Sequence, residues 1–274
     1  RSWRKAGVPM SVVIQSGFTG IAEPIDQPRI CFDTHTATPT ATSTATGADV
    51  AWLVDGETWS VWEGGGASQT VTLTFSSAAT SYAAIAAHNL GSTGATVSCA
   101  AGGVTVGSIS PDDDGAIVFL FGSTTVTTVA FTISGGSAAP QIAVAQAGEA
   151  LEMPQLSVFT GLPISESKQV RYRHQQSIRG DVLGRAVEGA DLRFDLTVQN
   201  LPETFRAAAG DVTWKGFINH VDNTGPFFIA AKPSSYPDDV AYARATERPR
   251  FNRERANLNN SGAVTFQCMG YAAP

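Results

Sequence analysis

The residues best suited to ligand chemistry include two tryptophans early in the chain. Trp59 and Trp62 are three positions apart and precede a loop that contains Gly64-Gly65-Gly66. Exposed indole rings can stack on the apolar face of a sugar or on a partner protein, whereas buried rings would close one end of a β-sandwich. We expect at least one of the two rings to be buried.

A polar pair, His88-Asn89, follows an apolar stretch and precedes a turn. At the mouth of a loop these side chains could hydrogen-bond a sugar, and with Trp59 and Trp62 they form our candidate glycan site. The interpretation that we favour for the pair is structural: backbone carbonyls satisfy the histidine, and the asparagine starts the turn.

The sequence contains none of the motifs typical of catalysis. No nucleophile elbow, phosphate-binding loop, zinc-binding H-E-x-x-H or dinucleotide fingerprint is found. Paired carboxylates for glycoside hydrolysis need to be close only in space, so a polysaccharide-degrading enzyme stays a weaker alternative. We predict that the chain is not an enzyme and has no cofactor.

Two features could be mistaken for metal or disulfide sites. Asp112-Asp113-Asp114 lies before Gly115, and this spacing favours a solvated turn over a calcium loop, whose ligands alternate. The cysteines are far apart, which predicts buried free thiols and no zinc site, with a bridge between the first two as the alternative. They are Cys31, Cys99 and Cys268.

The composition limits the partners of the chain. The 274 residues are 43% hydrophobic and 15% charged, with a net charge of −6. This balance argues against nucleic acid and anionic membranes as partners, and no apolar run reaches the roughly 18 residues of a membrane span. The first ten residues are basic, and either they dock on a neighbour or Met10 is the natural start.

The charge changes sign along the chain and marks a domain boundary. Up to Met153 the balance is four basic to twelve acidic residues, and after it fourteen to twelve. We predict an N-terminal arm at 1–17, a first domain at 18–152 and a second at 153–274.

Alternation and turn residues predict β structure throughout. We expect a leading strand near 12–14 in the N-terminal arm, and in the first domain strands near 70–75, 82–87, 95–98, 103–106, 116–121 and 125–133. In the second we expect strands at 168–176, 190–199, 213–221, 226–230 and 263–271, and one short helix at 201–210. Residues 34–46, rich in Thr and Ala, are expected to form an irregular edge segment.

Some of these residues resemble a known family. Leu53-Val54-Asp55-Gly56 with a following tryptophan, the Thr/Val strand and the Ala86-Ala87-His88-Asn89-Leu90 segment resemble the galactose-binding-like (discoidin-type) jelly roll over residues 18–151. In that family the L-x-D-G turn and the aromatic are structural signatures of an eight-stranded sandwich. The resemblance therefore implies a mainly β chain: a jelly-roll β-sandwich, followed here by a β-rich domain.

A second resemblance concerns assembly. Residues 86–97 are similar to segments in tail and tail-tip proteins of tailed bacteriophages, and the order of elements in the second domain resembles distal-tail or adaptor proteins. This resemblance implies a virion structural protein of the tail tip or baseplate, made in the host cytoplasm. Its partners would be the tail tube, hub and fibres, in a homo-oligomeric ring, with possible contact to a host surface glycan.

Arginines and two phenylalanines in the second domain are our candidates for the subunit interface, because buried aromatic rings and Arg–carboxylate pairs stabilise such contacts. They are Phe227, Phe228, Arg248, Arg250, Arg253 and Arg255. The alternative function is a carbohydrate-binding module of a secreted or surface protein.

Overall fold

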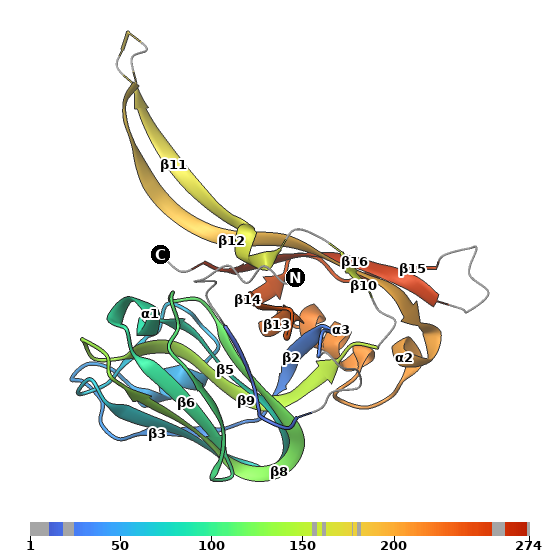
Figure 1. Cartoon of the computed structure of the whole chain (residues 1–274). Coiled ribbons are helices and arrows are strands. Elements are labelled where there is room, and N and C mark those ends of the chain that lie inside the picture. Colours follow the sequence, from blue (N-terminus) through green and yellow to red (C-terminus); the bar gives the residue numbers. More distant parts are fainter. Residues whose placement is uncertain are drawn as a thin grey trace, which may run out of the picture.

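The computed structural model describes residues 11–18, 25–154, 158–160, 163–176, 178–179, 182–253 and 261–272. The strands join edge to edge into one strongly bent sheet, which forms an N-terminal lobe, a C-terminal lobe and a projecting arm (Figure 1). The predicted fold class, mainly β with an N-terminal jelly-roll sandwich and a β-rich second part, is confirmed.

The N-terminal lobe contains β1 (Val12–Ile14), β2 (Arg29–Thr34), β3 (Thr38–Ala41), β4 (Trp62–Glu63), β5 (Gln69–His88), β6 (Thr96–Ala101), β7 (Val104–Ile109), β8 (Ile117–Ser134) and β9 (Gln141–Glu152). The later strands are β10 (Val158–Thr160), β11 (Lys168–Gln176), β12 (Val182–Pro202), β13 (Phe227–Lys232), β14 (Tyr236–Ala245), β15 (Arg250–Arg253) and β16 (Ser261–Tyr271). The helices are α1 (Leu90–Thr93), α2 (Glu203–Ala207), α3 (Trp214–Asp222) and the 3₁₀ turns η1 (Val50–Val54) and η2 (Ile164–Glu166).

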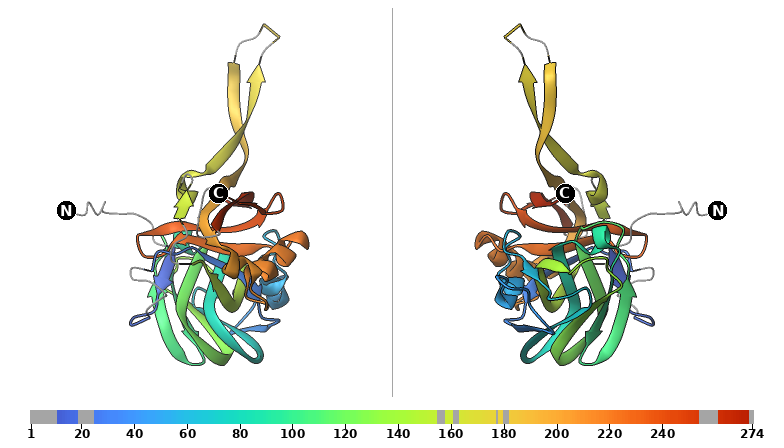
Figure 2. Two further views of the ribbon diagram at one scale, coloured as in Figure 1. Left: turned by 90° about the vertical axis from the view of Figure 1, so that its right-hand side faces the viewer. Right: turned by 90° about the vertical axis from the view of Figure 1, so that its left-hand side faces the viewer.

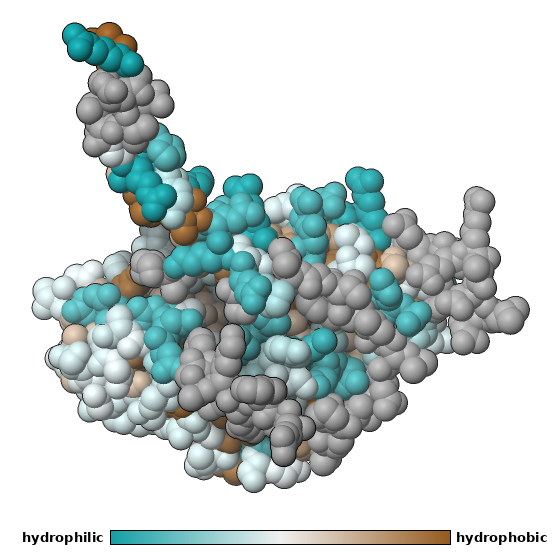
Figure 3. All heavy atoms as spheres, turned by 45° about the horizontal axis from the view of Figure 1, so that its top comes forward, coloured by the Kyte–Doolittle hydropathy of each residue, from teal (hydrophilic) through white to brown (hydrophobic). Residues whose placement is uncertain are grey.

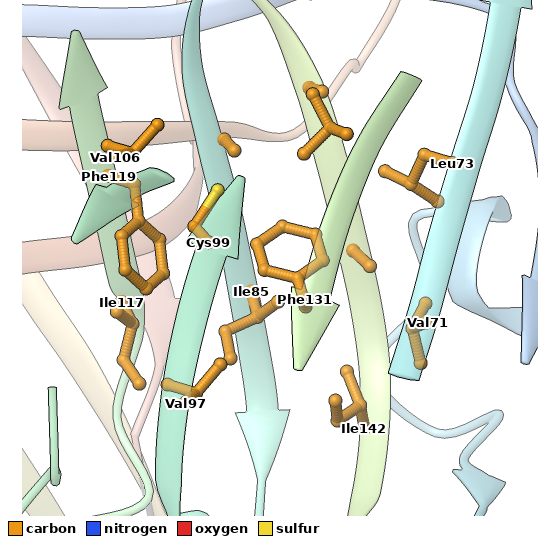
Figure 4. Close-up of a cluster of buried hydrophobic side chains, with 14 of the residues drawn as sticks. Val71, Leu73, Ile85, Val97, Cys99, Val106, Ile117, Phe119, Phe131 and Ile142 are labelled. Carbon is orange, nitrogen blue, oxygen red and sulfur yellow. The ribbon is translucent and has the colours of Figure 1, made fainter. Parts of the chain in front are cut away.

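The long, bent hairpin β5–β8 builds the sandwich. The first part of β5 pairs with β3 and its last part pairs with β9, while both parts pair with β8. Register shifts between Thr74 and Ala78 and between Thr80 and Tyr82 mark the bend, because an extra residue in one strand turns it away from its first direction. Phenylalanines from the two halves of β8 meet between the layers, with ring centres 6.1 Å apart (Figure 4). They are Phe119 and Phe131.

Small residues in the second half of β5 reflect burial on both faces. Ala83 and Ile85 lie in the core of the sandwich, whereas Ala84 and Ala86 lie in a second core with side chains of β13 and β14. A strand covered on both sides needs apolar residues at every position, which explains the run of small apolar residues that the sequence shows there.

The C-terminal lobe continues the same sheet through β2. This strand pairs with β9 on one edge and with β13 on the other, and β14, β16 and β12 follow. The sheet thus runs across the predicted boundary at 152/153, and the division into two domains stays a prediction.

Residues 213–221 were predicted as a strand, and this prediction is wrong, because most of the segment forms α3. The Thr213 hydroxyl accepts a hydrogen bond from the Gly216 N–H and caps the helix. Trp214, Phe217 and Val221 recur with helical spacing and are buried. The helix predicted at 201–210 is found as α2, and α1 is a further short helix.

Phe227 and Phe228 are not interface residues. Both are fully buried within the chain, on opposite faces of β13. Phe227 packs edge-on against Phe217 at 5.1 Å, and Phe228 packs against Tyr242 at 4.6 Å. Neither ring is available to a neighbour, because consecutive strand residues alternate between the two cores that β13 separates.

The arm consists of the last part of β11 and the first part of β12, and it projects away from both lobes (Figures 1 and 2). β11 pairs only with β12 among the described strands, and β12 reaches β16 only from Asp191 onward. We call residues 172–176, 178–179 and 182–189 the β-arm.

Other predictions about the chain can be compared with the structure directly. Cys31, Cys99 and Cys268 are buried free thiols, as predicted, so the alternative bridge is not formed. The edge segment at 34–46 contains β3, which pairs with β5. In the described part of the chain, no helix is long and apolar enough to cross a bilayer.

A substitution at Gly148 would test how closely β9 packs against β2. A Cβ there would lie 1.8 Å from the Asp33 carbonyl oxygen, a backbone atom that cannot move aside. We expect Gly148→Ala to lower the free energy of unfolding by more than about 2 kcal/mol, measured by urea denaturation. Gly122→Ala is the matched control on β8, because its Cβ would meet only the Phe18 ring at 3.6 Å. Equal stability of the two variants would contradict the tight contact.

Candidate functional site

Trp59 lies on a loop that the Leu53–Gly56 turn shapes. The Asp55 carboxylate accepts hydrogen bonds from the Glu57 N–H and the Ser60 hydroxyl, and Gly56 has a φ of 77° that favours glycine. These bonds hold the loop in a tight fold. The Trp59 ring is left 80% exposed, and an indole exposed to this extent is free to stack on a ligand.

The same loop is held to the C-terminal lobe by two contacts. The Tyr242 hydroxyl donates to the Gly56 carbonyl at 2.7 Å, and the Arg244 guanidinium pairs with Glu57 at 2.9 Å. Burial raises the pKa of Tyr242 above its usual range, so its hydroxyl stays a donor at neutral pH. The loop and β14 therefore form one rigid wall.

An open groove of about 410 Å³ lies along this wall. It is lined by residues of the loop and of the sheet at the base of the β-arm. Its polar side chains are those of Glu57, Thr58, Arg171, Asp191, Arg193, Tyr242, Arg244 and Tyr271. Met269, which is 46% exposed, adds an apolar surface to the groove.

The groove carries more positive than negative charge. Arg193 pairs with Asp191 at 2.9 Å and Arg244 with Glu57. Among the described residues no carboxylate pairs with Arg171, the third guanidinium. A guanidinium without a carboxylate partner is suited to an anionic or hydroxyl-rich ligand, because it presents several N–H donors in a planar fork.

Trp62 does not belong to this groove. Its ring is fully buried in the sandwich core, and its Nε1 donates to the Thr44 hydroxyl at 3.0 Å. The expectation that at least one of the two tryptophans is buried is confirmed. A ring enclosed in this way cannot stack on a sugar, so Trp62 is removed from the candidate glycan site.

His88 and Asn89 are structural as well. The His88 ring is buried, and its Nδ1 atom accepts from the Leu90 N–H. Asn89 donates to the Ala139 carbonyl and accepts from the Gln141 N–H. Both polar ends of the asparagine side chain are thereby used to join two loops. Asn89 starts the turn as predicted, since it directly precedes α1. The expectation that backbone carbonyls satisfy the histidine is wrong, because its Nδ1 atom accepts from an N–H and its buried Nε2 atom has no hydrogen-bond partner among the described residues.

Two of the candidate interface arginines have described side chains, and both are exposed. Arg248 pairs with Asp222 at 3.3 Å, and Arg250 lies on β15. Arg253 is described only in its backbone, and Arg255 lies outside the described residues. Their role at an interface stays a prediction.

Asp112, Asp113 and Asp114 form a bend, in agreement with the predicted turn. Asp113 accepts from the Gly115 N–H and Asp114 from the Ser92 N–H. In the ranges that the structure describes, no group of three or more His, Cys, Asp or Glu side chains is arranged to hold a metal ion.

The sequence could not reveal the groove. Glu57 and Arg244 are far apart in the chain, as are Arg171 and Tyr271, and only the pairing of β12, β14 and β16 brings their strands together. Nothing in the sequence connected Arg171 or Arg244 with the loop of Trp59.

Comparisons with known proteins give structural neighbours only, since no protein-family model and no curated protein matches the chain. Chitosan-binding module 1 of a chitosanase/glucanase from Paenibacillus sp. IK-5 is 16% identical, covers 42% of this chain and 97% of its own, and has a TM-score of 0.35. CpGH89CBM32-5 from Clostridium perfringens, in complex with GalNAc-β-1,3-galactose, is 18% identical, with coverages of 41% and 95% and a TM-score of 0.36.

A third neighbour is the CBM32 of AlyQ in complex with 4,5-unsaturated mannuronic acid. It is 20% identical, covers 43% of this chain and 96% of its own, and has a TM-score of 0.36. These neighbours are thus carbohydrate-binding modules. Similarity at this level of identity and TM-score does not establish what this chain binds.

The buried His88 makes stability depend on pH. Burial lowers the pKa of His88 to about 4, and nearby Asp114 and Asp113 only partly oppose this shift. Between pH ~6.5 and ~4 the unfolded chain binds a proton there that the folded chain does not, so stability falls as the pH falls.

We expect the wild type to lose about 2–3 kcal/mol more than His88→Gln between pH ~7 and ~4.5, measured by urea denaturation at each pH. His174→Gln, on the exposed part of β11, serves as the control and should keep the wild-type pH dependence. An unchanged pH dependence in His88→Gln would contradict the lowered pKa.

Proposed function

We propose that this chain is a non-enzymatic binding protein that recognises an acidic saccharide in the groove beside Trp59. The observation that carries the proposal is the 80% exposed indole on the loop that also forms one wall of the groove. A large apolar ring in water is otherwise unfavourable, and stacking on the C–H face of a sugar removes it from water.

The polar groups of the groove suit the remaining chemistry of a sugar. Guanidiniums donate to ring and hydroxyl oxygens, and the carboxylates of Glu57 and Asp191 accept from hydroxyls. These donors and acceptors are already oriented by the Arg193–Asp191 and Arg244–Glu57 pairs. Ordering them costs little on binding, because their side chains are held before the ligand arrives.

The net charge of the groove indicates which class of saccharide it would bind. Three guanidiniums against two carboxylates leave one positive charge, and Arg171 is the cation without a carboxylate partner among the described residues. A uronic acid or another carboxylated sugar would supply that partner, and a bidentate Arg–carboxylate contact is stronger than one to a neutral hydroxyl.

Isothermal titration with uronic-acid oligosaccharides and with their carboxyl-reduced, neutral forms tests the proposal. Trp59→Ala should weaken binding of both forms at least about tenfold, since stacking does not depend on the carboxylate. Arg171→Gln should weaken binding of the acidic form at least about fivefold and leave the neutral form unchanged. Tyr236→Ala is the control, because this aromatic is 51% exposed at the far end of β14 from Arg244.

No binding of either form at about 10 mM would overturn the proposal. Binding that survives Trp59→Ala unchanged would place the sugar elsewhere. Conversely, turnover of the oligosaccharide by the wild type would contradict the non-enzymatic part.

A second candidate function is assembly, as a structural component of a phage tail tip or baseplate in the virion. The β-arm favours it, since its two strands pair only with each other among the described strands, and such a ribbon is only marginally stable in water. Co-sedimentation with purified tail tubes tests this candidate. Binding that Tyr172→Ser in the arm abolishes supports it, and no binding by the wild type contradicts it.

A further inference from the structure

The β-arm exposes several apolar side chains to water. Tyr172 and Val187 are paired across the ribbon and are 41% and 65% exposed. Ile178 at the tip is fully exposed. Apolar side chains placed on facing strands, on an element that projects from the body, are typical of a surface that another protein covers.

The two faces of the β-arm differ. One face carries Tyr172 and Val187, with the Arg185 guanidinium 4.4 Å from the centre of the tyrosine ring. On the other face the long Arg173 lies opposite Ala186. In Figure 3 the described atoms of the arm are mainly hydrophilic, with hydrophobic atoms beside hydrophilic ones at the tip and near the base.

The β-arm has a small excess of positive charge. Residues 172–189 contain three arginines, Arg173, Arg179 and Arg185, and two acidic residues. Residues 30–167, which form most of the N-terminal lobe, contain eleven Asp and Glu and not one Lys or Arg. The charge of the arm is therefore complementary to a surface of the same chain.

The β-arm does not lie on that surface in its own chain. It projects away from the sandwich in both further views (Figure 2). Acidic side chains of the lobe are exposed, among them Asp49, Asp55, Asp112 and Asp113. The arm and the acidic side chains of the lobe are therefore both accessible to a second molecule.

We propose that the β-arm of one molecule docks on the acidic N-terminal lobe of a second copy of this chain. This inference rests on the second candidate function, assembly, and names its partner. The arm and the lobe are different surfaces, so the contact is head-to-tail, and repeating it closes a ring or extends a filament. The positive charge of the arm steers the encounter, and burial of Tyr172 and Val187 stabilises the contact.

Sedimentation velocity on the full chain tests the inference, with a variant that carries Tyr172→Ser, Arg173→Glu and Arg185→Glu. These changes leave Arg171 and the groove intact. The control carries Tyr236→Ser, Lys232→Glu and Lys215→Glu, which change charge and aromatic area equally and break the same type of cation–ring contact, Lys232 over Tyr236. Both variants should keep the far-ultraviolet circular dichroism of the wild type, because all six side chains lie outside the buried cores.

We expect the wild type and the control to associate and the arm variant to be at least about tenfold weaker. Raising salt from about 0.1 M to about 1 M, which shortens the Debye length from ~10 Å to ~3 Å, should weaken wild-type association at least about tenfold. Fluorescently labelled arm variant should still enter wild-type assemblies at one end, because its own lobe can accept a wild-type arm.

A wild type that stays monomeric at about 100 µM would overturn the inference. An arm variant that associates as strongly as the wild type would overturn it too, as would wild-type association that strengthens with salt. Exclusion of the labelled arm variant from wild-type assemblies would overturn it as well, because it would show that arms pair with arms. A monomer that nevertheless co-sediments with tail tubes would overturn the self-contact while leaving the assembly function standing.

Discussion

The position of the two lobes depends on the backbone pairing of β2, whose two edges join them. On one edge Ile30 pairs with Leu151 of β9, and on the other Cys31 pairs with Phe228 of β13. Side chains alternate along β2, so Ile30 and Phe32 enter the core under α3 while Cys31 enters the core behind the sandwich. A shift of one residue would exchange these faces, so the register of this single strand sets the position of one lobe relative to the other.

Because the register of β2 fixes the two lobes relative to each other, residues of both lobes together form the groove. Its loop belongs to the sandwich and its floor to the C-terminal sheet, and the Tyr242–Gly56 hydrogen bond and the Arg244–Glu57 pair join them. The ion pair is half-exposed and therefore contributes little to stability by itself. Its role is to orient two charged groups, which it can do because buried strands on both sides hold their backbones in place.

The sequence predicted the parts of the fold that depend on local pattern. Alternating Thr and Val in β5 predicted a strand buried on one face, and the turn residues around Asp112 predicted a bend. The strand prediction for residues 213–221 failed because their aromatic and β-branched side chains favour a strand, whereas the Thr213 cap and the packing of Phe217 against Phe32 favour a helix. The interface prediction for residues 227 and 228 failed because hydrophobic side chains suit a core and an interface equally, and only the three-dimensional fold separates the two.

The groove and the β-arm meet on one strand. Arg171 lines the groove and Tyr172 begins the arm, and a register shift in the β11–β12 pairing falls between them. An irregularity at this point lets the ribbon change direction as it leaves the body. The backbone that carries Arg171 pairs with Gly189 of β12 and continues directly into the β-arm. Under the two proposals above, a neighbour bound to the arm would hold the strand on the far side of Arg171 as well, which would couple the two surfaces without any contact between their ligands.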